Sequence, residues 1–205
     1  MGLEANCTVR HARKSVAGLA RLEEKILYFR ADVGALHLKI PFAQIRSADA
    51  RRGVLTVKWS AGEATFDLGA AAEKWSLKIR YPRSRIEKLG IKPDSLVSVL
   101  HIDDKSFWKE IEGRAGKVSD GKPAAGSDFI LVGVEDRSGL QPLRALQKSI
   151  QPAGAIWVVW PKGQPHIKED HVRAAALAVG LVDVKVMSFS ATHSALKLMI
   201  PRARR

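Results

Sequence analysis

The first part of the chain alternates apolar and polar residues in short runs, the pattern of antiparallel strands with one buried face. Leu36, Leu38 and Ile40 would share one face of such a strand, while His37 and Lys39 would share the other. Short turns that contain glycine or acidic residues separate the runs. The pattern predicts about six strands, near residues 16–22, 25–31, 35–40, 43–49, 53–59 and 63–68.

A helix is expected directly after these strands. Ala72, Trp75 and Ile79 recur at helical spacing and would form one apolar stripe, and Pro82 ends the helix. A strand meander closed by one helix, over residues 12–81, resembles the small barrels of the pleckstrin-homology-like (PH-like) and GRAM-like families. The resemblance implies a small antiparallel barrel with a closing helix. For pleckstrin-homology domains it also implies phosphoinositide binding through a basic first hairpin.

The first hairpin predicted from the pattern does not fit that lipid-binding role. It reads "ARLEEKILYF", with Glu23 and Glu24 at its tip. Two carboxylates would repel a lipid phosphate. The sequence therefore argues against phosphoinositide binding at this hairpin.

A change of pattern near Pro82 predicts a boundary between two domains. Residues 1–81 form the barrel with its helix, residues 82–94 form a basic connector, and residues 95–205 form an α/β domain. The connector region also suggests a basic patch that consists of Arg80, Arg83, Arg85 and Lys88.

The second domain alternates apolar strands with amphipathic helices. Strands that are apolar on both sides belong to a mostly parallel sheet covered on both faces, so we expect a three-layer α/β sandwich. The last two strands would pair as an antiparallel hairpin. The five expected strands lie near residues 96–102, 129–134, 155–160, 182–189 and 194–200.

Two resemblances concern this domain. The stretch "SIQPAGAIWVVWPKG", followed by "GLVDVKVMSFSATHSALKLMIP", is similar to the second half of a class I methyltransferase. Residues 82–201 also resemble a bacterial family known only as domain of unknown function 3052, through "KLGIKP", "WVVWPKG" and "GLVDVKV". That family implies no established activity.

The methyltransferase resemblance implies S-adenosylmethionine, which requires a glycine-rich turn after the first strand and an acidic residue at the end of the second. Here "DDKSFWKEI" follows the first strand without a glycine, and the second and third strands are not found in the pattern. Asp103 and Asp104 fit helix caps better than ribose ligands. We therefore expect no cofactor, with S-adenosylmethionine disfavoured.

The carboxyl ends of parallel strands meet at one rim of a sheet, where α/β proteins bind ligands. Lys162 follows the apolar strand 155–160, and the three carboxylates predicted to bind a ligand follow the two other strands of this group: Asp103, Asp104 and Glu135. Asp136, next to Glu135, is a further possible acid/base group. Lys162 would neutralise an anion there, and the carboxylates are candidate ligand-binding or acid/base groups. The alternative is that Lys162 is a solvated loop residue. No catalytic residue can be assigned, and no metal site is expected.

The net charge of +13 favours acidic or phosphate-bearing partners without specifying one. Our preferred interpretation is a non-catalytic binding or scaffold protein with a protein partner or an anionic ligand. An enzyme that acts on an anionic small molecule around Lys162 is the alternative. Nucleic-acid binding through the connector and residues 202–205 is a third, which the low aromatic content disfavours.

No apolar run of the sequence has the length of a membrane span, and the first residues lack the apolar core of a signal peptide. The single cysteine, Cys7, cannot form an internal disulfide. These features lead us to expect a cytoplasmic protein.

Overall fold

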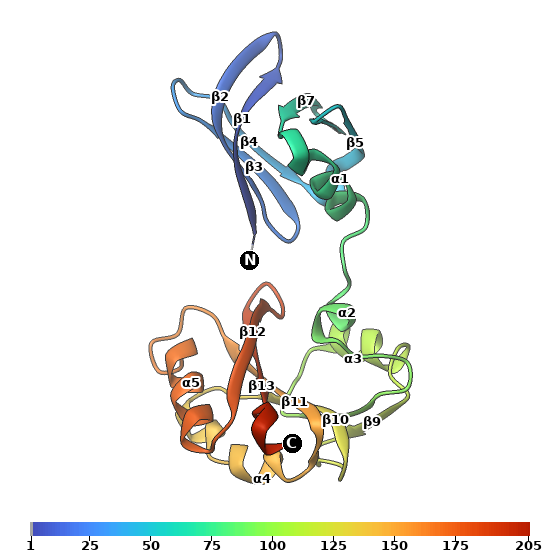
Figure 1. Cartoon of the computed structure of the whole chain (residues 1–205), viewed down its shortest axis with the longest axis vertical. Coiled ribbons are helices and arrows are strands. Elements are labelled where there is room, and N and C mark those ends of the chain that lie inside the picture. The colour runs from blue at the N-terminus through green and yellow to red at the C-terminus, as the bar shows by residue number, and fades with distance from the viewer. Residues whose placement is uncertain (1) are drawn as a thin grey trace. The chain divides into compact units, whose positions relative to one another are not determined.

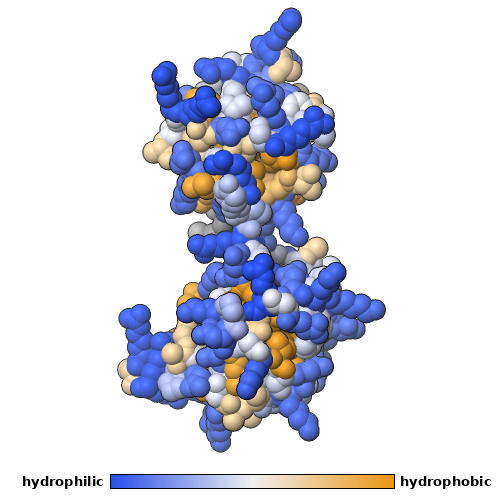
Figure 2. Space-filling view, turned by 90° about the vertical axis from the view of Figure 1, so that its right-hand side faces the viewer, coloured by the Kyte–Doolittle hydropathy of each residue, from blue (hydrophilic) through white to orange (hydrophobic). Residues whose placement is uncertain are grey.

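The computed structural model describes residues 2–205, and the chain divides into two compact units, with the boundary in the sequence between Arg83 and Ser84. Each unit has its own apolar core. Hydrophilic side chains cover most of the face shown in Figure 2, with small apolar areas between them. Within residues 2–205, no helix is long and apolar enough to cross a membrane.

The first unit is a curled seven-stranded antiparallel sheet with one helix packed against it (Figure 1). The strand order is β4-β3-β2-β1-β7-β6-β5. This arrangement confirms the predicted small antiparallel barrel with its closing helix. The elements are β1 (Leu3–His11), β2 (Lys14–Leu22), β3 (Ile26–Ala31), β4 (His37–Pro41), a 3-10 turn (Phe42–Gln44), β5 (Ile45–Arg51), β6 (Val54–Trp59), β7 (Gly62–Asp67), a second 3-10 turn (Gly69–Ala71) and α1 (Ala72–Arg80).

The pattern predicted six strands in this unit and missed β1. The buried face of β1 carries Cys7 and Val9, and its remaining residues are mostly small or polar, so the alternation is weak in the sequence. Nine residue pairs join β1 to β2, and β1 also pairs with β7. β1 is therefore the strand that joins the two halves of the sheet.

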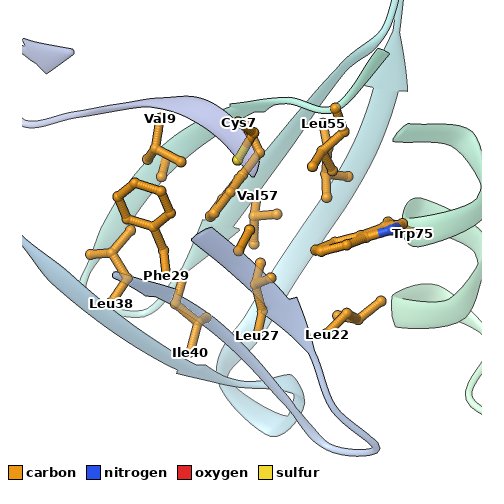
Figure 3. Close-up of a cluster of buried hydrophobic side chains, with 14 of the residues drawn as sticks. Cys7, Val9, Leu22, Leu27, Phe29, Leu38, Ile40, Leu55, Val57 and Trp75 are labelled. Carbon is orange, nitrogen blue, oxygen red and sulfur yellow. The ribbon is translucent and has the colours of Figure 1, made fainter. Parts of the chain in front are cut away.

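Trp75 anchors α1 in the core of the first unit. Figure 3 shows its ring entering the cluster from the helix, among side chains from several strands. Trp75 is only 2% exposed, and the next residue, Ser76, donates a 2.7 Å hydrogen bond to the carbonyl of Ala48 in β5. Burial of a large aromatic side chain is the main favourable contribution expected from this helix.

The second unit is a six-stranded, mostly parallel sheet with helices on both faces. The strand order is β12-β13-β11-β10-β8-β9, and β13 is the one strand of this sheet that runs antiparallel to its neighbours, β11 and β12. The elements are α2 (Arg85–Leu89), β8 (Leu96–Leu100), α3 (Lys105–Glu112), β9 (Lys117–Asp120), β10 (Ser127–Gly133), a 3-10 turn (Arg137–Leu140), α4 (Leu143–Gln147), β11 (Ile150–Pro161), α5 (Glu169–Ala178), β12 (Val182–Ser188), β13 (His193–Met199) and a final 3-10 turn (Arg202–Arg204).

This topology confirms the predicted methyltransferase-like α/β sandwich and its terminal hairpin. The sheet contains one strand more than predicted, because β9 forms within the loop "GRAGKVSDGKPAAGS". β9 has four residues and pairs in parallel with β8. Its half-buried Val118 is the one large apolar residue in the strand, so periodicity gives no signal for it.

Residues 84–89, which the sequence assigned to a connector, are part of the second unit. Ser84 caps α2 in a capping box with Glu87, and Gly90 ends the helix with a φ of 85°. Ile86 and Leu89 are buried in the core of the second unit. The indole of Trp157 in β11 donates a 3.1 Å hydrogen bond to the carbonyl of Leu89, which fixes α2 against the sheet.

Candidate functional sites

The strands β1 and β2 form a hairpin (Figure 1). Basic residues cluster in the sequence at its tip. Its turn consists of Ala12 and Arg13, both with positive φ, of 46° and 64°. A two-residue turn of this kind matches the twist of the paired strands. We define the hairpin cluster as the four basic residues at this tip, namely Arg10, His11, Arg13 and Lys14.

These residues line a hollow of about 450 Å³. Arg10, Arg13 and Lys14 are exposed. The one carboxylate that lines the hollow belongs to Glu63, which is paired with Lys58 at 3.1 Å. The lining therefore has an excess of positive charge, and its other members are Ala12, Ser15, Ala64 and Thr65.

His11 is held in place at one side of this hollow. Its ring stacks on Trp59, with 5.5 Å between the ring centroids, and its Nδ1 lies 2.8 Å from the carbonyl oxygen of Glu63. Both partners come from the strands β6 and β7 that follow next in the sheet. His11 therefore joins the tip of the β1–β2 hairpin to β6 and β7.

This geometry corrects the identification of the first hairpin. The first hairpin of the unit is β1–β2, and Glu23 and Glu24 lie in the next turn, between β2 and β3. The Glu23 carboxylate lies 3.6 Å from the guanidinium of Arg21, near the end of β2. The repulsion between these two carboxylates and a phosphate therefore concerns the second hairpin. It does not argue against phosphate binding at the basic first hairpin.

In the second unit, Asp104 caps α3 and holds an ion pair. One carboxylate oxygen accepts hydrogen bonds from the Phe107 backbone and the Ser106 hydroxyl, at 2.9 and 2.7 Å. The other lies 2.6 Å from the Arg85 guanidinium. Burial alone would raise the pKa of Asp104, but these bonds and the positive charge outweigh it and lower the pKa to about 2. The helix-cap interpretation of Asp104 is confirmed.

Arg85 is the centre of this network and is mostly buried. Its side chain is 11% exposed and also pairs with Glu110 at 3.0 Å. The guanidinium lies over the rings of Phe107 and Phe189, at 5.1 and 4.9 Å from their centroids. The Arg85 guanidinium is therefore held by carboxylates and aromatic rings of the second unit, and it does not contribute to an exposed basic patch.

The other residues predicted for the basic patch belong to different units. Arg80 and Arg83 belong to the first unit, while Lys88 lies on α2 of the second. The Arg80 guanidinium lies 5.5 Å from the centre of the Tyr81 ring. Binding by the three remaining residues of the patch stays a prediction.

Lys162 follows β11 at the rim, as predicted, and its ammonium group is bound to the turn between β12 and β13. Nζ donates to the Ser188 hydroxyl and the Ser190 carbonyl, each at 2.7 Å, and approaches the Ala191 carbonyl at 3.3 Å. A hollow of about 420 Å³ lies beside it, lined also by Trp160, Gly163, Gln164, Pro165, Ile167, Lys168, Glu169 and Ser194. None of the three predicted carboxylates lines this hollow.

Asp103 and Glu135 are exposed at the ends of β8 and β10. The structure therefore brings Lys162, Asp103, Asp104 and Glu135 to the same rim of the sheet without joining them in one cavity. Ligand binding by these four residues stays a prediction.

The structure adds one rim residue that the sequence pattern missed. Asp120 ends β9, the second strand of the unit, where an acidic residue is required for ribose binding in the methyltransferase fold. The turn after β8 contains no glycine. Its first residue is His101, which adopts a positive φ of 53°. A side chain at Gly133 of β10 would lie 2.0 Å from the His101 carbonyl oxygen, so the backbone of this turn packs tightly against β10.

Within the described residues 2–205, no group of three or more His, Cys, Asp or Glu side chains could hold a metal ion. Cys7 of β1 is buried in the core of the first unit, and burial, together with the charge of Asp67, raises its pKa to about 11. A thiol in this state is a poor nucleophile at neutral pH.

The sequence matches no family model and no curated protein, so the resemblance to domain 3052 has no matching family model behind it. Among solved structures it is similar to a SAM-dependent methyltransferase from Aquifex aeolicus, at 14% identity and a TM-score of 0.41, covering 57% of this chain and 87% of that one. A TehB-like SAM-dependent methyltransferase from Corynebacterium glutamicum gives 11% identity and a TM-score of 0.40, covering 63% and 96%. A structure described as the DhpI–SAH complex gives 10% and 0.46, covering 62% and 87%. The fold assignment rests on the strand order given above.

Proposed function

We propose that this is a non-catalytic binding protein whose first unit holds a phosphate-bearing ligand at the β1–β2 hairpin. The observation that carries the proposal is the cluster of Arg10, His11, Arg13 and Lys14 around a hollow whose only acidic lining residue is already paired. Arginine and lysine bind phosphate oxygens through charge-assisted hydrogen bonds.

The second unit supports the non-catalytic part of the proposal. Asp104 is ionised, and its two oxygens cap α3 and pair with Arg85. The Lys162 ammonium is bound to three oxygens, one at the end of β12 and two in the turn that follows. A general acid or base needs a proton that it can give or accept near neutral pH. The turn after β8 lacks the glycines that S-adenosylmethionine requires, which supports the absence of that cofactor.

The experiment is a titration of the intact chain with inorganic pyrophosphate, followed through backbone amide NMR signals. We expect saturable shifts of the amides of residues 10–15, which weaken as salt rises because the contact is electrostatic. Vesicles with and without anionic lipid distinguish a lipid headgroup from a free phosphate as the source of the ligand. Absence of hairpin shifts with both pyrophosphate and anionic vesicles would overturn the proposal, and turnover of S-adenosylmethionine by the purified chain would overturn its non-catalytic part.

A further inference from the structure

The hollow beside Lys162 is lined by a buried tryptophan whose indole N–H has no protein partner. Trp160 lies at the end of β11 and is only 4% exposed. Within residues 2–205 its Nε1 forms no hydrogen bond, whereas the indoles of Trp108 and Trp157 each donate to a backbone carbonyl. Buried indole N–H groups usually have such an acceptor.

The Trp160 N–H is nevertheless not sealed inside the core. Among the described residues, every side-chain nitrogen or oxygen that is fully buried has a hydrogen-bond partner. An N–H without a partner must therefore reach solvent, and the hollow is the open space that Trp160 borders. The indole thus offers an unused donor to whatever occupies the hollow.

Ser194 of β13 supplies a second unused donor. It lies directly opposite Trp160 in the antiparallel register and lines the same hollow. Residues opposite each other in such a pair present their side chains on the same face of the sheet, about 5 Å apart at Cβ. Within residues 2–205 the Ser194 hydroxyl has no hydrogen-bond partner either. An indole N–H and a hydroxyl therefore lie side by side in this hollow.

The charge available in the hollow is positive. Lys168, at the start of α5, is exposed, and in the described part of the chain no carboxylate forms an ion pair with it. The acidic lining residue, Glu169, is held by the Arg173 guanidinium at 2.6 and 3.0 Å. The Lys162 ammonium already has three oxygen acceptors. Lys168 is therefore the lining cation that can take an added acceptor.

We propose that this hollow binds a small monocarboxylate. The carboxylate oxygens accept hydrogen bonds from the Trp160 N–H and the Ser194 hydroxyl, and Lys168 neutralises the charge. One available cation matches the single charge of a carboxylate better than the charge of a phosphate group, which approaches two at neutral pH.

The size and the remaining lining fit a ligand of this kind. The hollow has a volume of about 420 Å³, and small-molecule sites span roughly 300–1,000 Å³. Pro165 adds apolar surface for a short hydrocarbon chain. The site belongs to the second unit and does not depend on the hairpin cluster of the first.

The test adds sodium butyrate to the intact chain and follows the tryptophan indole N–H signals by NMR, with sodium chloride at equal ionic strength as the reference. The Trp160 signal, identified by its loss in Trp160→Phe, should shift and saturate because its N–H gains an acceptor. The signals of Trp108 and Trp157 should stay in place, since both indoles already donate to carbonyls. Butyramide, which has the same carbon chain without the charge, should bind at least about tenfold more weakly.

Two variants test the other donors. Lys168→Met should weaken butyrate binding at least about tenfold, which corresponds to about 1.4 kcal/mol. Ser194→Ala should also weaken it, because one hydrogen bond to a charged group is lost. The matched control Lys148→Met removes an exposed lysine that does not line the hollow and should keep the wild-type affinity.

A Trp160 signal that does not move at any butyrate concentration would overturn the site. Wild-type affinity in either Lys168→Met or Ser194→Ala would overturn it as well. An equal response to butyramide or to inorganic phosphate would contradict a carboxylate as the ligand. None of these results changes the pyrophosphate shifts expected at the hairpin, and a failure at the hairpin leaves the butyrate result in place.

Discussion

The guanidinium of Arg85 lies 2.6 Å from the Asp104 carboxylate, and this contact joins the start of α2 to the cap of α3. Asp104→Ala removes the cap and the ion pair together and should destabilise the second unit by about 2 kcal/mol, the upper range for loss of a cap. Asp104→Asn keeps a good cap and should cost less. Urea unfolding measures both, and a loss below about 0.5 kcal/mol for Asp104→Ala would contradict this role.

The same carboxylate predicts an acid dependence. The pKa of Asp104 is about 2 in the folded chain, against about 3.9 for an aspartate in an unfolded chain. The ionised form therefore stabilises the fold above the unfolded value, and this contribution is lost as the pH falls from about 4 towards 2. Stability measured at several pH values should fall less steeply in Asp104→Asn than in the wild type. Parallel curves for the two proteins would contradict the lowered pKa.

Trp75 should dominate the stability of α1. It is 2% exposed, so Trp75→Ala should cost about 3–5 kcal/mol in denaturant unfolding, the range for deletion of a large buried aromatic side chain. Leu77 lies on the same helix and is 46% exposed, and Leu77→Ala should stay within about 0.5 kcal/mol. Similar losses in the two variants would place Trp75 outside the core.

Lys162 should matter for local structure, a role that the sequence did not indicate, since it left Lys162 as either an anion-binding residue or a solvated loop residue. Lys162→Met removes the charge-assisted bonds to Ser188 and Ser190 and should cost about 1 kcal/mol. Hydrogen exchange of residues 190–193 should become faster. The control Lys122→Met removes another exposed lysine of the unit and should change neither quantity. Unchanged exchange in Lys162→Met would return Lys162 to the role of a solvated residue.

The sequence predicts most of the fold because the buried strands and helices carry clear periods of two and 3.6 residues. It misses β1 and β9, whose buried positions are small or few. The error in β1 had a functional consequence, since the first hairpin was then placed at Glu23 and Glu24 and not at the basic turn.

The candidate sites were less predictable because their contacts join residues far apart in the chain. Arg85 and Asp104 are separated by 19 positions, and Lys162 and Ser188 by 26. Neither pairing leaves a spacing signal, so the sequence shows neither the ion pair of Asp104 nor the hydrogen bonds of Lys162.

The most direct test of the proposed function compares two double variants of the first unit in the intact chain. Arg10→Gln with Lys14→Gln neutralises the hairpin cluster and avoids Arg13, whose positive φ makes substitution harder to interpret. Arg51→Gln with Lys74→Gln removes the same charge from exposed positions that do not line the hollow.

The affinity for inorganic pyrophosphate is then measured through the amide signals of residues 12 and 13. The hairpin variant should bind at least about tenfold more weakly than the wild type, equivalent to about 1.4 kcal/mol, while the control keeps nearly all of its affinity. Equal losses in the two variants would mean that pyrophosphate responds only to net charge, and that result would contradict a phosphate site at the β1–β2 hairpin.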